Sequence, residues 1–255
     1  TLTSEIRSQK RGGRGSKAAG TKDSDFIEHL FTAWTHNYLI FFTEKGRCYW
    51  LRVYEVPEGS RQSKGRAIQN LIQIEPDDKI KTFITVEDLK NEDVLNNTSV
   101  IMVTRQGTIK KTFLEAYSRP RANGINAINI NDGDELLEAK LVKPGEDVVL
   151  ALRSGRAIRF NEDETRNMGR NSTGVRGVRL ADENDAVVGM VIIHDPEAQL
   201  LVVSENGYGK RSSIEDYRVT GRGGKGVKTM NITDKTGLLV SIVSVTDTSN
   251  DLMII

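Results

Sequence analysis

The sequence has little cysteine and little histidine, and both shortages exclude kinds of site. Cys48 is its only cysteine, so neither an internal disulfide nor a zinc cluster built from cysteines can form. The three histidines, His29, His36 and His194, lie far apart and lack the i, i+4 spacing of a helical metal-binding pair. We therefore expect no metal site and no cofactor in this chain.

Long apolar runs and catalytic motifs are also missing. No stretch approaches the roughly 18 apolar residues that span a bilayer, and residues 1–20 are basic and polar, without the apolar core of a signal peptide. We therefore expect no membrane partner and a cytoplasmic location. The phosphate-binding pattern Gly-x-x-x-x-Gly-Lys-Ser/Thr does not occur, and no converging set of catalytic residues favours an enzyme.

The chain also lacks an excess of charge. Its 36 Lys and Arg against 35 Asp and Glu give a net charge of +1, whereas a DNA-binding domain often has a clear basic excess. Binding to a polyanion therefore depends on how the charges are arranged.

A tandem repeat of about 50 residues organises the sequence. A glycine followed by alternating apolar and polar residues recurs four times after Gly15, at steps of 50, 59, 50 and 52 residues. These glycine-led segments are residues 65–72, 124–130, 174–180 and 226–232. Each is predicted to be a strand, because alternation with period two is typical of a half-buried strand.

Two further features keep the same period. An apolar strand, a glycine turn and a strand with basic residues recur, and a glycine suits the positive φ of such a hairpin turn. The turn glycines are Gly46, Gly107, Gly155 and Gly207. An acidic turn that leads into another apolar strand also recurs, at residues 77–84, 132–137, 182–188 and 234–239. Each unit is thus predicted to contain four strands.

Short strands rich in Val, Ile, Leu and Thr between Gly, Asp and Asn turns predict an all-β, antiparallel fold. A four-stranded unit cannot bury both faces alone, so the units are predicted to be blades of a propeller-like ring. Residues 25–34 have a helix-like period, but their place in the repeat predicts a strand. The chain is predicted to be a single domain, 1–255, with units at about 36–90, 97–143, 147–194 and 199–246.

The two ends of the chain contain further pieces of the repeat. Residues 1–35 and 251–255 match parts of a unit. Two arrangements fit these ends: four complete units with parts of two others, or a five-unit ring closed by pairing of its ends.

The repeat separates the two signs of charge. The loops before the glycine-led segments hold 17 of the 36 basic residues and no acid. They are Lys10, Arg11, Arg14, Lys17, Arg61, Lys64, Arg66, Arg119, Arg121, Arg166, Arg170, Arg176, Arg179, Arg218, Arg222, Lys225 and Lys228. Acids gather at the following turns, and successive β-turns lie at opposite ends of their strands. A nearly neutral chain can therefore present a basic belt to a polyanion, although one such loop alone is usually a solvated connection.

The strongest local motif is Gln9-Lys10-Arg11-Gly12-Gly13-Arg14-Gly15, which has a weaker echo at residues 220–226. Its glycines let the backbone approach phosphates, and its cations supply charge-assisted hydrogen bonds. Alone, such a run also fits a disordered RNA-binding tail. Within this repeat it resembles the gyrase A box, Gln-(Arg/Lys)-Arg-Gly-Gly-(Arg/Lys)-Gly, of the DNA gyrase A C-terminal domain. Residues 25–30, 35–36, 45–50 and 65–71 are similar to the same family.

This resemblance implies a six-bladed β-pinwheel, in which neighbouring blades exchange strands. The implied role is wrapping of duplex DNA with positive handedness. An A2B2 complex with gyrase B, at the bacterial nucleoid, would then introduce negative supercoils with ATP and Mg. The family's strand-cleaving tyrosine follows an arginine, and no Arg-Tyr pair occurs here. The fragment alone is therefore predicted to be no enzyme.

The resemblance makes Gln9 to Gly15 the principal DNA-binding residues. Further DNA contacts are expected from basic residues of the loops, where later copies of the box match only in part. These residues are Lys17, Arg61, Lys64, Arg66, Arg119, Arg121, Arg170, Arg176, Arg222, Lys225 and Lys228. Two rival functions are the C-terminal domain of topoisomerase IV, which lacks an intact box, and a propeller that scaffolds other proteins.

Ordinary roles are expected for the remaining conspicuous residues. Phe41, Phe42, Tyr49 and Trp50 follow one another along strands, which favours packing inside a blade over stacking on bases. The paired acids lie in turns, where Asp is favoured for local hydrogen bonding.

Overall fold

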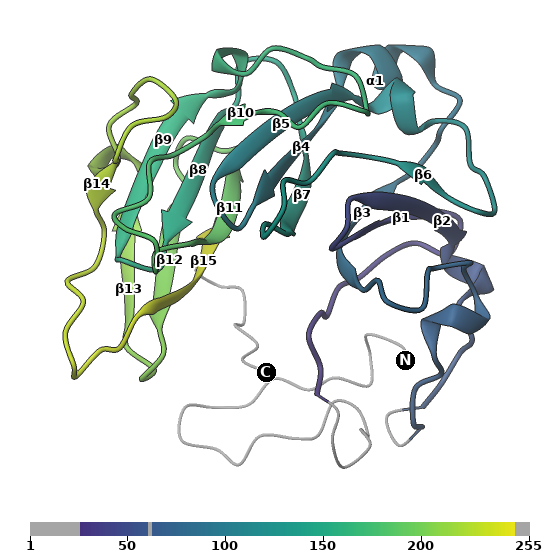
Figure 1. Ribbon diagram of the computed structural model, residues 1–255, viewed down its shortest axis with the longest axis horizontal. Helices are drawn as coiled ribbons and strands as arrows, with labels where there is room; N and C mark the ends of the chain where they lie inside the picture. Colours follow the sequence, from purple (N-terminus) through teal and green to yellow (C-terminus); the bar gives the residue numbers. More distant parts are fainter. Residues whose placement is uncertain (1–25, 61–62, 248–255) are drawn as a thin grey trace.

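The computed structural model describes residues 26–60 and 63–247, which form four antiparallel sheets side by side in an open arc (Figure 1). The first sheet contains β1 (Tyr38–Thr43), β2 (Arg47–Arg52), β3 (Ile80–Val86) and β6 (Ile125–Asn126). The second contains β4 (Ser99–Thr104), β5 (Thr108–Phe113), β7 (Leu136–Val142) and β10 (Val175–Arg176). The third contains β8 (Asp147–Leu152), β9 (Arg156–Asn161), β11 (Val187–Ile193) and β14 (Val227–Lys228). The fourth contains β12 (Gln199–Ser204), β13 (Gly209–Ser213) and β15 (Leu239–Val245).

Every sheet is built on the same plan. A hairpin occupies the middle of each four-stranded sheet, and in all four sheets the strand after the acidic turn pairs with the first strand of the hairpin. These inner strands, β3, β7, β11 and β15, lie toward the centre of the arc (Figure 1). The fold is therefore the all-β, propeller-like architecture that the repeat predicts.

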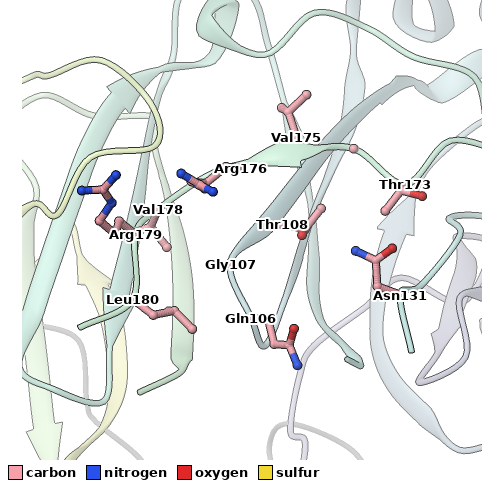
Figure 2. A pocket seen from close by; sticks show the side chains of 11 residues that line it. Gln106, Gly107, Thr108, Asn131, Thr173, Val175, Arg176, Val178, Arg179 and Leu180 are labelled. Carbon is pink, nitrogen blue, oxygen red and sulfur yellow. The ribbon is translucent and has the colours of Figure 1, made fainter. Parts of the chain in front are cut away.

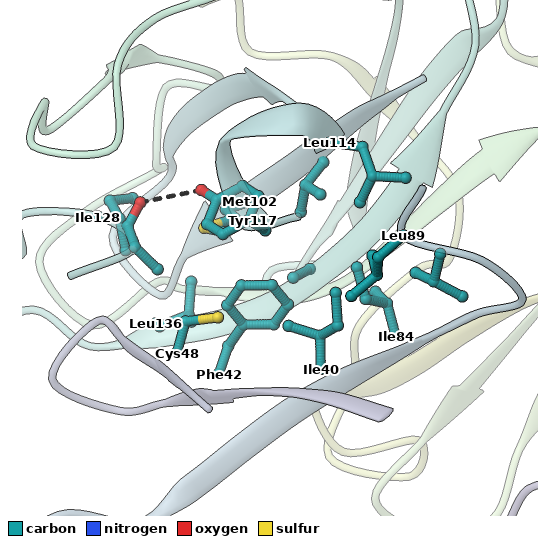
Figure 3. Close-up of a cluster of buried hydrophobic side chains, with 14 of the residues drawn as sticks. Ile40, Phe42, Cys48, Ile84, Leu89, Met102, Leu114, Tyr117, Ile128 and Leu136 are labelled. Atoms are coloured by element: carbon teal, nitrogen blue, oxygen red, sulfur yellow. Dashed lines mark hydrogen bonds between the residues drawn. The ribbon is translucent and has the colours of Figure 1, made fainter. Parts of the chain in front are cut away.

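The core lies between neighbouring sheets. One cluster joins the first and second sheets through Phe42, Met102 and Tyr117 (Figure 3). Similar clusters fill the next two junctions. Burial of about 25 cal/mol per Å² of apolar surface stabilises each junction, and no sheet provides that burial alone. β8 is buried along nearly its whole length because sheets cover both of its faces, whereas β12 alternates between buried and half-buried residues.

The outermost strand of each complete sheet comes from the next repeat. We call β6, β10 and β14 the crossing strands, because each leaves its own unit and pairs with the second hairpin strand of the preceding sheet. Arg47 lies opposite Asn126 in the first sheet, and Thr108 lies opposite Arg176 in the second. The exchange of strands between blades that the resemblance implies is thus present.

The crossing strands need glycine at the point where they meet the preceding sheet. Gly124, Gly174 and Gly226 have φ of 69°, 105° and 70°. A Cβ on Gly226 would lie 2.2 Å from the carbonyl oxygen of Ala157, and one on Gly174 would lie 2.4 Å from that of Ile109. Both the positive φ and the close backbone approach exclude other residues.

An acidic residue fixes each of the first three hairpin turns. The carboxylate of Asp78 accepts a hydrogen bond from the Lys45 amide, and that of Asp134 accepts one from the Gln106 amide. Asp185 accepts from both the amide and the hydroxyl of Ser154. The acidic turns therefore have the local hydrogen-bonding role expected of them, at the hairpin end of each sheet.

Four features differ from the prediction. The glycine-led segments are strands for only two residues, since they pair only where they cross the preceding sheet. Residues 65–72 form no strand: they contain the 3₁₀ helix η3 (Ile68–Asn70), and no sheet in the described part precedes the first. Residues 26–34 form no strand either. They lie against β3 through side chains, with the Phe31 and Phe83 rings 4.0 Å apart and His29 hydrogen-bonded to the Lys81 carbonyl.

The fourth difference is the helix α1 (Glu92–Asn97) between the first and second sheets. Its N-terminus is capped by the Asn91 side chain, which accepts a hydrogen bond from the Val94 amide, and Leu95 is buried. No helix in residues 26–60 and 63–247 is long and apolar enough to cross a membrane.

Gly174→Ala tests the constraint at the crossings. We expect it to lower the free energy of unfolding by more than about 1 kcal/mol, because a left-handed backbone alone costs an L-residue roughly 1–2 kcal/mol. Chemical denaturation measures the effect. Gly65→Ala is the matched control, since its φ is not positive and a Cβ there would meet no atom within 4 Å. Equal losses in the two variants would show that the crossing does not require glycine.

Candidate nucleic-acid interface

The structure describes half of the predicted DNA-binding residues. The box, Gln9 to Gly15, lies outside the described residues together with Lys17 and Arg61. The exposed members of the predicted set are Lys64, Arg66, Arg119, Arg121, Arg176, Lys225 and Lys228. Arg170 and Arg222 are only half-exposed, because their guanidinium groups bind main-chain carbonyls.

Three basic loops lie between the end of a hairpin and a crossing glycine. We call residues 118–124, 166–174 and 218–226 the outer loops. They follow the 3₁₀ helices η4 (Leu114–Tyr117), η5 (Glu162–Glu164) and η6 (Ile214–Asp216). A corresponding 3₁₀ helix, η2 (Val53–Glu55), follows β2 in the first sheet. The crossing strands that the outer loops lead into form the outside of the arc (Figure 1).

The acidic turns lie at the other end of the hairpins. Asp78, Asp134 and Asp185 contact the hairpin turns, whereas the outer loops begin where the second hairpin strands end. Lys45 in the first hairpin turn forms an ion pair with Asp77, and Arg105 in the second binds Glu135 at 2.9 Å. These two cations near the acidic turns are therefore paired with acids, while most cations of the outer loops face solvent.

A polar groove of about 510 Å³ opens beside the second hairpin turn. It is lined by residues 106–108, by Asn131 and by residues 173–180 around β10. Figure 2 shows Arg176 and Arg179 beside this groove, and both side chains are exposed. Polar walls and two nearby guanidinium groups suit contact with an anion.

Lys110 on β5 is a buried cation that the sequence pattern does not single out. Its ammonium group donates to the carbonyls of Ala127 and Arg170, both at 2.6 Å, and to that of Ser172 at 3.4 Å. Burial, and secondarily the charge of Arg170, lowers the pKa of Lys110 from 10.5 to about 7. Through its hydrogen bonds to the Arg170 and Ser172 carbonyls, Lys110 fixes the main chain of the loop at residues 170–172. The only feature of the sequence that could have drawn attention to Lys110 is its position on the second hairpin strand of the repeat.

Other side chains of the second hairpin strands join one sheet to the next. Lys111 forms a buried ion pair with Glu162 and also donates to the Glu162 carbonyl at 3.0 Å. Arg159 pairs with Asp147 at 2.8 Å and donates to the carbonyls of Ile214 and Tyr217. Trp50 has the same place in the first hairpin, and its indole N–H donates to the Tyr117 carbonyl at 2.9 Å. These side chains hold the 3₁₀ helices in place and are committed to the fold.

The aromatic residues expected to pack inside the blades do so. Phe41, Phe42 and Tyr49 are buried, and Trp50 is half-buried. Residues 26–60 and 63–247 hold no group of three or more His, Cys, Asp or Glu side chains arranged for a metal ion. His194 instead contacts the Glu146 carboxylate at 2.6 Å.

The depressed pKa of Lys110 predicts how stability depends on pH. Between about pH 7 and 10.5 the unfolded chain holds a proton on Lys110 that the folded chain has released. The free energy of unfolding contributed by this group therefore rises with pH across that window. We expect the wild type to gain stability relative to Lys110→Met over this range, because methionine does not titrate.

Denaturant titrations of both proteins at several pH values measure this difference. The slope with pH is the readout, because Lys110→Met also leaves the carbonyls of Ala127 and Arg170 without their donor. A difference in stability between the two proteins that stays constant with pH would contradict the lowered pKa of Lys110.

Comparisons with known proteins agree with this architecture. The family model described as DNA gyrase C-terminal domain, beta-propeller, matches residues 1–33, 37–87, 98–143, 146–194 and 198–246. The DNA gyrase A protein of Staphylococcus epidermidis is 45% identical over 253 residues, and that of Staphylococcus aureus is 44% identical. Each match covers 99% of this chain and 28% of the relative, so the chain spans little more than a quarter of their length.

Two solved structures share the fold. A DNA gyrase A C-terminal domain superposes with a TM-score of 0.75 at 24% identity, covering 96% of this chain and 78% of that one. The C-terminal domain of a DNA topoisomerase IV superposes with a TM-score of 0.71 at 26% identity, covering 84% of this chain and 65% of that one. The family model and the 44–45% identity to gyrase A show that this chain belongs to the family of DNA gyrase A C-terminal domains.

Proposed function

We propose that this chain binds duplex DNA without sequence specificity and bends it along the outside of the arc. The observation that carries the proposal is the position of the outer loops, which hold exposed cations at the outer edge of successive sheets. Phosphate contacts from such side chains give affinity independent of base sequence. Membership of the gyrase A family supports the same role.

The separation of charge explains how a chain of net charge +1 can hold DNA. Acids and the cations beside them occupy the hairpin turns, and the outer loops contain no acid. A duplex lying on the outer loops would therefore meet local positive potential, which the net charge conceals. Smooth bending of DNA by 40–90° costs about 1–6 kcal/mol, so contacts must continue along the path to offset it.

In the larger protein, this wrapping would set the handedness of the bound segment. We propose that it wraps DNA with positive handedness, so that a complex of two gyrase A and two gyrase B chains introduces negative supercoils in an ATP-dependent manner. Cleavage of DNA and binding of ATP and Mg would belong to other parts of that enzyme. This chain would need no cofactor of its own and would act at the nucleoid in the bacterial cytoplasm.

Salt dependence tests the binding mode. We expect the affinity for duplex DNA to fall steeply as salt rises, with a log-log slope of about 0.9 for each phosphate neutralised, because bound cations release counterions. Fluorescence anisotropy at several salt concentrations measures the slope. The pair Arg119→Ala and Arg121→Ala should lower affinity and slope without abolishing binding, and Asp132→Ala in an acidic turn is the control. A salt-independent affinity would exclude the outer loops as the contact.

Replacement of Gln9 to Gly15 by alanines tests wrapping. We expect the chain to remain folded but to stop changing the linking number of relaxed circular DNA that is ligated in its presence, because the contact that anchors one end of the path is lost. In the intact enzyme, relaxation should persist while negative supercoiling disappears. Normal supercoiling by the substituted enzyme would show that Lys10, Arg11 and Arg14 do not anchor DNA.

A further inference from the structure

We propose that Arg170 and Arg222 are positioning residues that fasten the outer loops 166–174 and 218–226 to the preceding crossing strand, so that neighbouring loops form one connected surface for DNA. This inference rests on the proposed DNA-binding function for its consequence, but the linkage itself is a property of the free protein. It gives these two cations a different role from the exposed Lys225, which lies in the same loop as Arg222.

The two arginines occupy equivalent positions and make equivalent bonds. Each lies four residues before a crossing glycine, Arg170 before Gly174 and Arg222 before Gly226. Nη1 of Arg170 donates to the Asn126 carbonyl at 3.0 Å, and Nη1 of Arg222 donates to the Arg176 carbonyl. Both acceptors lie two residues after the crossing glycine of the preceding unit. The bond therefore recurs in two of the three outer loops.

Main-chain hydrogen bonds join the same loops at equivalent places. The Asn129 amide donates to the Ser172 carbonyl at 3.1 Å, and the Arg179 amide donates to the Gly224 carbonyl at 2.9 Å. The Gly223 amide also donates to the Gly177 carbonyl at 2.8 Å. Main-chain hydrogen bonds therefore join each of these two loops to the segment that follows the previous crossing strand. The arginine adds a side-chain hydrogen bond to the same contact.

The arginine at this position fits the linkage because of its several donors. Arg222 uses Nε to bind the Glu164 carbonyl at 3.0 Å while Nη1 binds the Arg176 carbonyl, so one side chain holds two segments of the preceding unit. A lysine presents its three donors from one nitrogen and binds several carbonyls only where all lie within reach of that atom, as around Lys110, whereas the Arg222 guanidinium reaches its two carbonyls from separate nitrogens. The loop at 118–124 has Pro120 at the equivalent position, which offers no side-chain donor.

Lys225 in the same loop provides the contrast. Its side chain is exposed and forms no hydrogen bond or ion pair within residues 26–60 and 63–247. It is therefore available to phosphates, whereas Arg222 is half-exposed and already bound to carbonyls. Lys225 is thus suited to direct contact with phosphates, whereas Arg222, three residues earlier, is suited to positioning the loop.

Hydrogen exchange of the full chain without DNA tests the linkage. We expect Arg222→Ala to quicken exchange of the Gly223 and Arg179 amides by about tenfold or more, because loss of a charged donor loosens the loop locally. Arg222→Lys should do the same although it keeps the charge, and Lys225→Ala should leave both amides unchanged. Arg170→Ala, monitored at the Asn129 amide, is an independent second test. Unchanged exchange in the Arg222 and Arg170 variants would overturn the linkage.

DNA titrations of the same variants separate positioning from direct contact. Lys225→Ala should lower the salt slope by about 0.9, because one phosphate contact is lost. Arg222→Lys should weaken binding while the slope stays near that of the wild type. A slope lowered equally by Arg222→Ala and Lys225→Ala, with normal exchange, would make Arg222 an ordinary phosphate contact. If exchange quickens as expected and no variant changes DNA binding, the proposed function is wrong and the loop linkage stands.

Discussion

The crossing of a glycine-led strand onto the preceding sheet is the constraint on which the rest of the structure depends. At Gly124, Gly174 and Gly226 the backbone takes a positive φ, and at the last two a Cβ would lie within 2.4 Å of a carbonyl oxygen. The crossing makes each four-stranded sheet the product of two repeats. No unit is then complete by itself, and the cores between sheets follow from the exchange.

The same crossing determines where the charges lie. Each second hairpin strand runs from a turn held by an acid to a 3₁₀ helix, and the outer loop then returns the chain to the preceding sheet. The outer loops themselves thereby hold cations and no acid, although the 3₁₀ helices that precede them carry acids and Arg176 lies opposite Thr108 beside the second hairpin turn. Cations within the sheets, such as Lys111 and Arg159, bind the neighbouring parts of the fold. The surface that we propose for DNA is the set of exposed cations in the outer loops, and Arg170 and Arg222 are the residues proposed to link two of those loops to the preceding unit.

Much of this fold could be predicted from the sequence, because three strands of each unit end at glycine or acidic turns that recur with the same period. The hairpin glycines and the acidic turns were therefore placed correctly. The length of the crossing strands was wrong, since pairing depends on a neighbouring sheet that local sequence does not reveal. Residues 26–34 and 65–72 fit the repeat but have no strand partner in the described part of the chain.

Less of the candidate site could be predicted. The pattern identified which loops are basic, but it treated all their cations alike, because hydrogen bonds such as that from Arg222 to Arg176 depend on tertiary structure. Lys110 escaped notice for the same reason, since its carbonyl ligands come from two different units. The assignment of the box to DNA contact is a prediction that rests on the family resemblance.

The most direct test of this account is lysine acetylation of the chain with and without duplex DNA, quantified by mass spectrometry. Three exposed lysines, Lys64, Lys225 and Lys228, lie in or beside the basic loops, and three others, Lys45, Lys79 and Lys235, lie at the hairpin and acidic turns. The account predicts that DNA protects the first three and leaves the second three reactive. Protection of the second set, or equal protection of both, would contradict it.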